Sequence, residues 1–192
     1  MPRSRKIEVD DVLDAAERVI GRLGLAGLSI DAVAKEAGIS KSRVVYDHKS
    51  KSALMEALVA RKLDAAREAV RATVADCANT PHPELFGRIA IAACPVNEQG
   101  RSIMRAIGAA ASSGEPFQHK FRDRSEEDFR AISTGTDRPR AALMAYLALV
   151  GFYCTEVLDR QDWDDDERTR ILNDIRSIFT SFPEPTSQPS IS

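Results

Sequence analysis

The segment 29–48 constrains the fold more than any other, because it has the pattern of two short helices joined at one glycine. Ser29 is a favourable N-cap residue, and apolar residues follow it with the spacing of one buried helical face: Ile30, Val33, Ala34 and Ala37. Gly38 ends this helix, since the residue after a helix often has a positive φ that glycine adopts without strain. Ser40 is a second N-cap. The pattern predicts a helix-turn-helix whose second helix covers 41–48.

The second predicted helix carries many hydrogen-bond donors. If Val44 and Val45 form its buried side, the remaining side chains project outward: Lys41, Ser42, Arg43, Tyr46, Asp47 and His48. In a helix-turn-helix the second helix lies in the major groove, where arginine pairs with guanine and serine adapts to several bases. Alanine-rich hairpins with a glycine turn also occur in all-α proteins of other functions. From this segment alone, DNA binding and plain helix packing are equally open.

The flanking segments extend the pattern. An amphipathic helix is predicted over 9–23, and another begins near Ser50. With these flanks the sequence resembles the TetR/AcrR family of transcriptional regulators. The matching residues cover about the first third of the chain: Val12-Leu13, Ala15-Ala16, Val19-Ile20, Gly24, Gly27-Leu28-Ser29, Val33-Ala34, Ala37-Gly38-Ile39-Ser40, Ser50-Lys51 and Leu54.

Two positions depart from the family pattern at the end of the second helix. The family usually has an aromatic residue where Val45 stands and a phenylalanine where His48 stands. The side chain of His48 therefore has two open placements, in the core or against a DNA phosphate.

The resemblance implies an all-α fold, in which a long helix joins an N-terminal three-helix DNA-binding domain to a C-terminal helical domain for ligand binding and dimerisation. The expected boundaries are 5–65 and 66–182, followed by a disordered Pro/Ser tail over 183–192. Arg3, Arg5 and Lys6 form either a DNA-binding arm or an ordinary solubilising terminus. The expected DNA contacts are Ser29, Ser40, Lys41, Ser42, Arg43, Tyr46, His48, Lys49 and Lys51.

The charge distribution agrees with a DNA-binding N-terminal region. The chain has 192 residues and a formal net charge of −2, which hides an asymmetry between its parts. Residues 1–63 hold 12 Lys/Arg against 9 Asp/Glu, and the remainder holds 15 against 20. The excess of basic residues lies where the DNA surface is expected.

Cysteine usage and hydropathy indicate a cytoplasmic protein. Cys77, Cys94 and Cys154 are far apart and form no Cys-x-x-Cys pair, so we expect reduced thiols without a disulfide framework or zinc site. The charged N-terminus does not have the pattern of a signal peptide. The longest apolar run, 141–154, is too short to span a bilayer. We expect a soluble protein in the cytoplasm.

The middle of the chain predicts a long helix and several shorter ones. Segment 50–79 has no glycine or proline and predicts a helix to about residue 78. Thr80-Pro81-His82-Pro83 ends it, with His82 as a loop residue. Further helices are predicted over 84–93, 97–111, 117–132 and 138–159, and from about 164 to 182.

Weak periodicity in these middle helices has two explanations, a cavity lined by several helices or a loosely regular core. If there is a cavity, the apolar residues expected to line an effector pocket are Phe86, Ile89, Ile103, Met104, Ile107, Phe117, Phe121, Met144 and Leu147. Arg105, His119 and Glu156 are its candidate polar groups.

The last two predicted helices are the candidate dimer interface. The helix over 138–159 is apolar on most sides, which requires more than one packing partner. Asp164 and Glu167 have capping-box spacing at the start of the last helix. The two helices either pair with a second copy as a four-helix interface or close a monomeric core, and the resemblance favours the dimer. Its expected residues are Leu143, Leu147, Val150, Tyr153, Ile171, Ile175, Ile178 and Phe182.

No enzyme motif is present. The sequence has no Gly-x-Ser-x-Gly, P-loop or His-Glu-x-x-His pattern, and its three histidines lie on separate predicted elements. We therefore expect no catalytic site, metal or cofactor. The resulting hypothesis is a homodimeric repressor that a small molecule releases from a palindromic double-stranded operator. The alternative is a helical dimer that binds small molecules or proteins and lacks useful DNA affinity, and an enzyme using the middle cavity is a third, weaker possibility.

Overall fold

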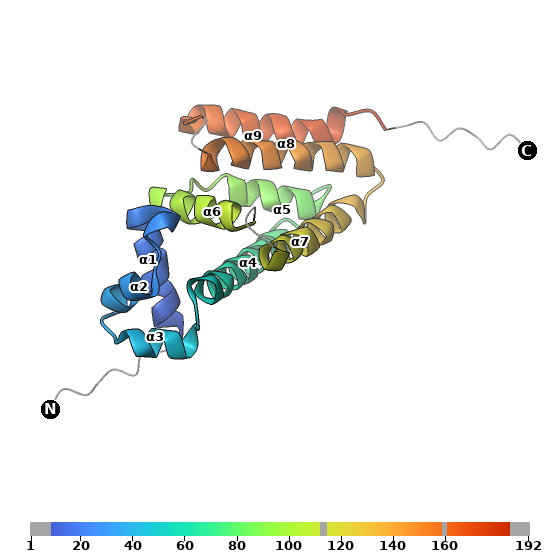
Figure 1. Ribbon diagram of the computed structural model, residues 1–192. Coiled ribbons are helices and arrows are strands. Elements are labelled where there is room, and N and C mark those ends of the chain that lie inside the picture. The colour runs from blue at the N-terminus through green and yellow to red at the C-terminus, as the bar shows by residue number, and fades with distance from the viewer. Residues whose placement is uncertain (1–8, 112–114, 159–160, 185–192) are drawn as a thin grey trace, which may run out of the picture. The chain divides into compact units, whose positions relative to one another are not determined.

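The computed structural model describes residues 9–111, 115–158 and 161–184, and within them every regular element is a helix (Figure 1). This confirms the all-α prediction. The helices are α1 Val9–Gly27, α2 Ile30–Ala37, α3 Lys41–Asp47, α4 Lys51–Asp76, α5 Pro83–Ala92, α6 Glu98–Ala111, α7 Glu115–Ser133, α8 Pro139–Val157 and α9 Asp165–Ser181. The expected basic arm, residues 185–192 of the expected tail and the side chain of Phe117 lie outside what the structure describes.

The chain divides into two compact units. The first lies within residues 1–66 and 96–121, and the second within 67–95 and 122–192. Both α4 and α7 therefore contribute to each unit. The sequence places its domain boundary near the first of these crossings, but it assigns 97–111 to the C-terminal domain. In the structure this segment is α6, which packs in the first unit.

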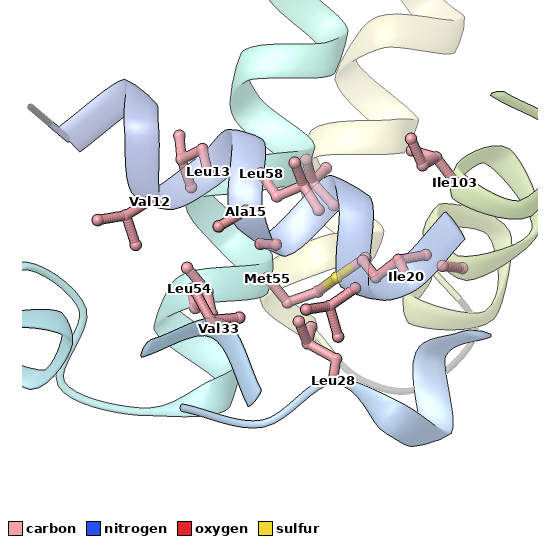
Figure 2. Close-up of a cluster of buried hydrophobic side chains, with 14 of the residues drawn as sticks. Val12, Leu13, Ala15, Ile20, Leu28, Val33, Leu54, Met55, Leu58 and Ile103 are labelled. Atoms are coloured by element: carbon pink, nitrogen blue, oxygen red, sulfur yellow. The ribbon is translucent and has the colours of Figure 1, made fainter. Parts of the chain in front are cut away.

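The core of the first unit forms around α1. Val12, Val19 and Ile20 are fully buried because they recur at helical spacing on one face of α1. The labelled side chains of Figure 2 converge on this face from α2, α4 and α6, including Val33, Leu58 and Ile103. The hydroxyl of Ser102 in α6 donates to the carbonyl of Ile20 at 3.0 Å. The buried side chains of α2 and α3 belong to this core, which therefore supports the helix-turn-helix.

The second unit has its own core, formed by α5, α8 and α9 with Ile132 of α7. Helices α8 and α9 run side by side (Figure 1). Asp164 and Glu167 form the capping box that the sequence predicts at the start of α9. Among the described residues α8 has the length and composition to cross a membrane. Leu149 and Phe152 of α8 pack into this core, so we assign it as a core helix.

His82 caps α5, although the sequence suggests only a loop residue. Its side chain is buried, and Nδ1 accepts a hydrogen bond from the backbone N–H of Leu85 at 3.2 Å. Because Nδ1 accepts, the neutral ring must donate from Nε2, which lies 2.9 Å from the carbonyl oxygen of Ile132. His82 thus ties the start of α5 to the end of α7.

Candidate nucleic-acid interface

The turn between α2 and α3 has the conformation that its glycine predicts. Gly38 has φ 68° and ψ 33°, in the left-handed region, and its N–H donates to the carbonyl of Lys35 at 3.3 Å. The hydroxyl of Ser29 accepts from the N–H of Ala32 at 3.1 Å, and that of Ser40 accepts from the N–H of Arg43 at 3.2 Å. Both N-caps are confirmed. These local contacts set the helix-turn-helix geometry.

An ion-pair cluster fixes α2 against α1. Glu36 of α2 lies 2.9 Å from Arg18 Nε and 2.8 Å from Arg22 Nη2 of α1. The hydrogen bonds from these guanidinium groups lower the pKa of Glu36. A second cluster joins α1 to α4, where Arg61 pairs with Asp14 at 2.7 Å and with Glu17. The sequence does not predict these pairs, because the two residues of each pair lie on different helices.

The outward face of α3 is polar and accessible. Tyr46 is 79% exposed, and Ser40, Lys41 and Ser42 are exposed. The hydroxyls of Ser40 and Ser42 lie 3.0 Å apart. Arg43 is exposed on the same face. Serine, lysine, arginine and tyrosine side chains donate hydrogen bonds to base edges and phosphates. We call Ser40, Lys41, Ser42, Arg43 and Tyr46 the recognition face.

Three cations of the predicted interface already have protein partners. Lys41 Nζ lies 2.9 Å from Asp31 Oδ2 of α2, and both side chains are exposed. Lys51 Nζ donates to the carbonyl of Leu25 at 3.1 Å. Arg43 contacts Asp47 and the ring of Tyr46 within α3. Asp31 and Asp47 were absent from the predicted interface, although the Arg43–Asp47 spacing of four residues was available as a signal.

Three predictions about the sides of α3 are wrong. Asp47 was expected to project outward, and its side chain is only 8% exposed. Val45 is 39% exposed rather than buried, and His48 is 6% exposed rather than available to DNA. Val44 is the fully buried valine, and His48 follows it by four residues, so the two share the face that packs on the core. The N–H of His48 donates to the carbonyl of Val44 at 2.7 Å. We therefore remove His48 from the candidate contacts and keep Lys49, which is exposed.

Burial makes His48 sensitive to acid. Removal from water lowers its pKa below the ordinary value of 6.5, and the negative charge of Asp47 raises it by less. The stability from neutral His48 is complete above about pH 6.5 and is lost as the pH falls through the lower pKa of the folded protein.

We expect His48→Phe to weaken the pH dependence of stability between about pH 7 and about pH 5, because phenylalanine binds no proton in this buried position. Urea unfolding of both proteins, followed by circular dichroism across this range, measures the difference. Equal acid sensitivity in the variant and the parent would contradict the assignment.

The residues expected to line an effector pocket are divided between the two cores. In the first unit Ile103 is buried, and Ile107 and Phe121 pack against the same core. In the second unit Ile89 is buried and Phe86 packs beside it. Met104 and Met144 are half-buried, and Leu147 is exposed.

The candidate polar groups of the pocket also have definite surroundings. Arg105 pairs with Glu98 at 2.8 Å, and Glu156 pairs with Arg168. His119 is exposed. Arg105 and Glu156 thus have pairing partners that their sequence positions alone did not reveal.

The residues expected at a dimer interface are partly accessible. Leu147 and Val150 of α8 are exposed large apolar side chains, at 45% and 38%. Ile175 is buried in the second core, so it supports α9 from inside. The remaining expected residues are half-buried: Leu143, Tyr153, Ile171, Ile178 and Phe182.

Comparison with models of known protein families identifies the family of this chain. The family described as bacterial regulatory proteins, tetR family, matches residues 12–58, which include the helix-turn-helix. The tetracyclin repressor-like C-terminal domain matches residues 64–179, more than half of the chain. The chain belongs to the TetR family. The resemblance found in the sequence is confirmed, and this TetR-family protein is a transcriptional regulator with a DNA-binding helix-turn-helix domain, in a family of regulators that are not enzymes.

Solved structures share the fold over nearly their whole length. A protein from Mesorhizobium loti assigned to the TetR family is 16% identical, with a TM-score of 0.74 over 90% of this chain and 94% of that chain. A regulator from Saccharomonospora viridis, solved with choline, is 16% identical, with a TM-score of 0.69 over 88% and 94%. The multidrug binding protein EbrR, solved with malachite green, is 20% identical, with a TM-score of 0.65 over 86% and 96%. A search of curated proteins finds no significant match.

Proposed function

We propose that this TetR-family regulator is a homodimeric repressor, which a small molecule releases from a palindromic operator. The observation that carries the proposal is the recognition face of α3. Arg43 and Tyr46 project from a helix whose turn, caps and supporting core are all in place. Such a face matches the major groove of a DNA duplex.

The DNA contacts divide into two kinds. Ser40, Ser42 and Arg43 lie at the start of α3, the part of a recognition helix that meets base edges. Ser29 and Tyr46, with the cations Lys41, Lys49 and Lys51, are the proposed phosphate and groove contacts that fix register. Lys41 pairs with Asp31, and both side chains are exposed. Lys41 therefore exchanges this carboxylate for a DNA phosphate at little cost in free energy.

Two copies are needed to read a palindrome, because its half-sites are about 34–36 Å apart. The proposed interface uses α8 and α9, where Leu147 and Val150 expose apolar surface. An apolar face of this kind is stabilised by a second copy of itself in an isologous interface. Of the other expected residues of both helices, all but the buried Ile175 are half-buried.

A small molecule is the proposed releasing signal. Two proteins with the same fold were solved with choline and with malachite green, which supports ligand binding in this architecture. The effector must bind the DNA-incompatible state more tightly, by about 1.4 kcal/mol for each tenfold loss of DNA affinity. A protein that acts on an operator is expected in the cytoplasm, where bacterial DNA is.

Arg43→Ala tests the proposed DNA contacts. We expect loss of specific operator binding with the fold retained at some cost in stability, because Arg43 is exposed but pairs with the largely buried Asp47. A gel-shift assay with a duplex selected by the parent protein measures the loss. Arg71→Ala is the matched control, since Arg71 is an exposed arginine of the second unit. Unchanged affinity of the Arg43 variant would rule out this role.

A helical dimer without useful DNA affinity is the second candidate. The exposed Val45 and the buried His48 favour it, because both replace the aromatic residues that the family usually has at these positions. Such a protein would bind a small molecule or a partner protein through its C-terminal region. It would show no steep dependence of DNA affinity on salt concentration.

A further inference from the structure

We propose that Asp47 is a positioning residue that holds Arg43 for a guanine, so that the operator carries a G·C pair opposite this arginine in each half-site. The inference rests on the proposed function and names the base pair that the recognition face selects. Three side chains of α3 support it: Arg43, Tyr46 and Asp47.

The carboxylate of Asp47 is largely buried, whereas the arginine that it contacts is accessible. The Asp47 side chain is 8% exposed and lies 3.3 Å, Oδ2 to Nε, from an Arg43 side chain that is 45% exposed. Its Oδ2 is buried and has no hydrogen-bond partner within the described part of the chain. The ion pair with Arg43 therefore compensates a charge that would otherwise be costly to bury.

The ring of Tyr46 makes a second contact that restricts the position of the Arg43 guanidinium. The Cζ atom of Arg43 lies 5.6 Å from the centroid of this ring, within the range of a cation–π contact. With one contact at Nε and another at the ring, fewer arginine rotamers remain to be lost on binding. The side chain is held before DNA arrives.

Among the described residues Arg43 is paired through Nε, which leaves its two terminal nitrogens for the duplex. Guanine presents two acceptors in the major groove, N7 and O6, which match two parallel N–H donors. Adenine presents one acceptor and one donor, so its amino group would face an N–H of the arginine. The negative charge of Asp47 also disfavours a phosphate beside Arg43, which directs this arginine to a base rather than to the backbone.

Lys41 provides an internal contrast. Its partner Asp31 is exposed, so this pair is weak and exchanges readily. The partner of Arg43 is buried, so its position is retained when DNA binds. The two aspartates therefore differ in what they do: Asp31 competes with DNA for a cation, and Asp47 orients one.

The test selects binding sites from a pool of random-sequence duplexes with the full-length protein. The selected sites should contain a G·C pair at one position of each half-site. Affinity is then measured on the selected duplex and on duplexes with that pair replaced by A·T. We expect Asp47→Asn to reduce the preference for G·C about tenfold or more, with the salt dependence of binding unchanged. A residue that served folding alone would not alter base preference separately from salt dependence.

Three further variants complete the design. Arg43→Lys keeps the charge and loses the paired donors, so it should lose the same preference. Tyr46→Phe keeps the ring that contacts Arg43, so it should retain the preference for G·C even where loss of the hydroxyl lowers the affinity for all duplexes. Asp47→Glu keeps a carboxylate and moves it by one methylene; it should show an intermediate preference, and it tests the position even if Asp47→Asn does not fold.

The outcomes separate this inference from the proposed function. If Arg43→Lys loses the preference for G·C while both Asp47 variants keep it, the role of Asp47 is overturned and DNA reading by Arg43 stands. If the selected sites have no G·C pair that depends on Arg43, the inference is overturned while DNA binding itself remains. If the parent protein binds no duplex in a salt-dependent manner, the proposed function and the inference fail together.

Discussion

Replacing Asp128 with asparagine is expected to lower the free energy of unfolding of the second unit by about 3 kcal/mol. Asp128 accepts from Arg88 Nη2 at 2.8 Å, from Arg124 Nε at 3.1 Å and from the hydroxyl of Tyr146 at 3.3 Å. Arg88 is buried, and Glu84 is its other carboxylate partner. Asparagine leaves a buried guanidinium with an incomplete set of acceptors, which is far more costly than losing an exposed pair.

Tyr146 remains a neutral donor in this network. Burial raises its pKa to about 12, and the negative charge of Asp128 acts in the same direction. The tyrosine therefore donates to Asp128 throughout the physiological pH range and adds to the loss when Asp128 is replaced.

Trp163 makes the Asp128 prediction measurable. It is the single tryptophan of the chain and packs against the core of the second unit, so its fluorescence follows the unfolding of this unit in urea. Glu127→Gln is the matched control, because Glu127 is one residue away and pairs with Arg67 in solvent at 3.1 Å. The control should change stability by no more than about 0.5 kcal/mol. Equal effects of the two variants would contradict a buried network.

Placing a glutamate at Val150 is expected to weaken operator binding about a hundredfold or more. Val150 and Leu147 are exposed apolar residues of α8 within the proposed interface. A charge there must lose water on association without a partner, so the variant should be monomeric. A monomer contacts one half-site at a time and loses the gain from simultaneous binding to two.

Analytical ultracentrifugation and gel shift together measure this effect. Ala69→Glu is the control, since it adds the same charge at an exposed position of α4 outside the proposed interface. It should remain dimeric and bind normally. A Val150→Glu protein that is still dimeric, or a parent protein that is monomeric at the same concentration, would contradict the proposed interface.

Local signals explain which parts of the fold were predictable. Gly38, Ser29 and Ser40 act on backbone groups within four residues, so their roles follow from the sequence directly. The capping box of Asp164 and Glu167 is local in the same way. By contrast, α6 joins the first unit through contacts such as Ser102 to Ile20, which are 82 residues apart and leave no local pattern.

The short length of α3 explains the errors at the candidate site. Seven residues make about two turns, so either Val44 with Val45 or Val44 with His48 could define its buried side. The core behind α3 decides between these choices, and that core comes from α1, α2 and α4. Asp47 was expected to project outward but was left out of the DNA contacts, because an acidic residue does not suggest DNA contact. The structure suggests a role for Asp47 because its side chain is largely buried beside Arg43.

The salt dependence of DNA binding tests the central claim, that the recognition face of α3 binds duplex DNA, most directly. Binding of the full-length protein is measured on the selected duplex and on a random duplex over a series of salt concentrations. We predict that log K falls with log salt by about 0.9 for each phosphate contacted, and that the selected duplex binds at least about a thousandfold more tightly. A flat salt dependence with equal affinity for both duplexes would contradict the account.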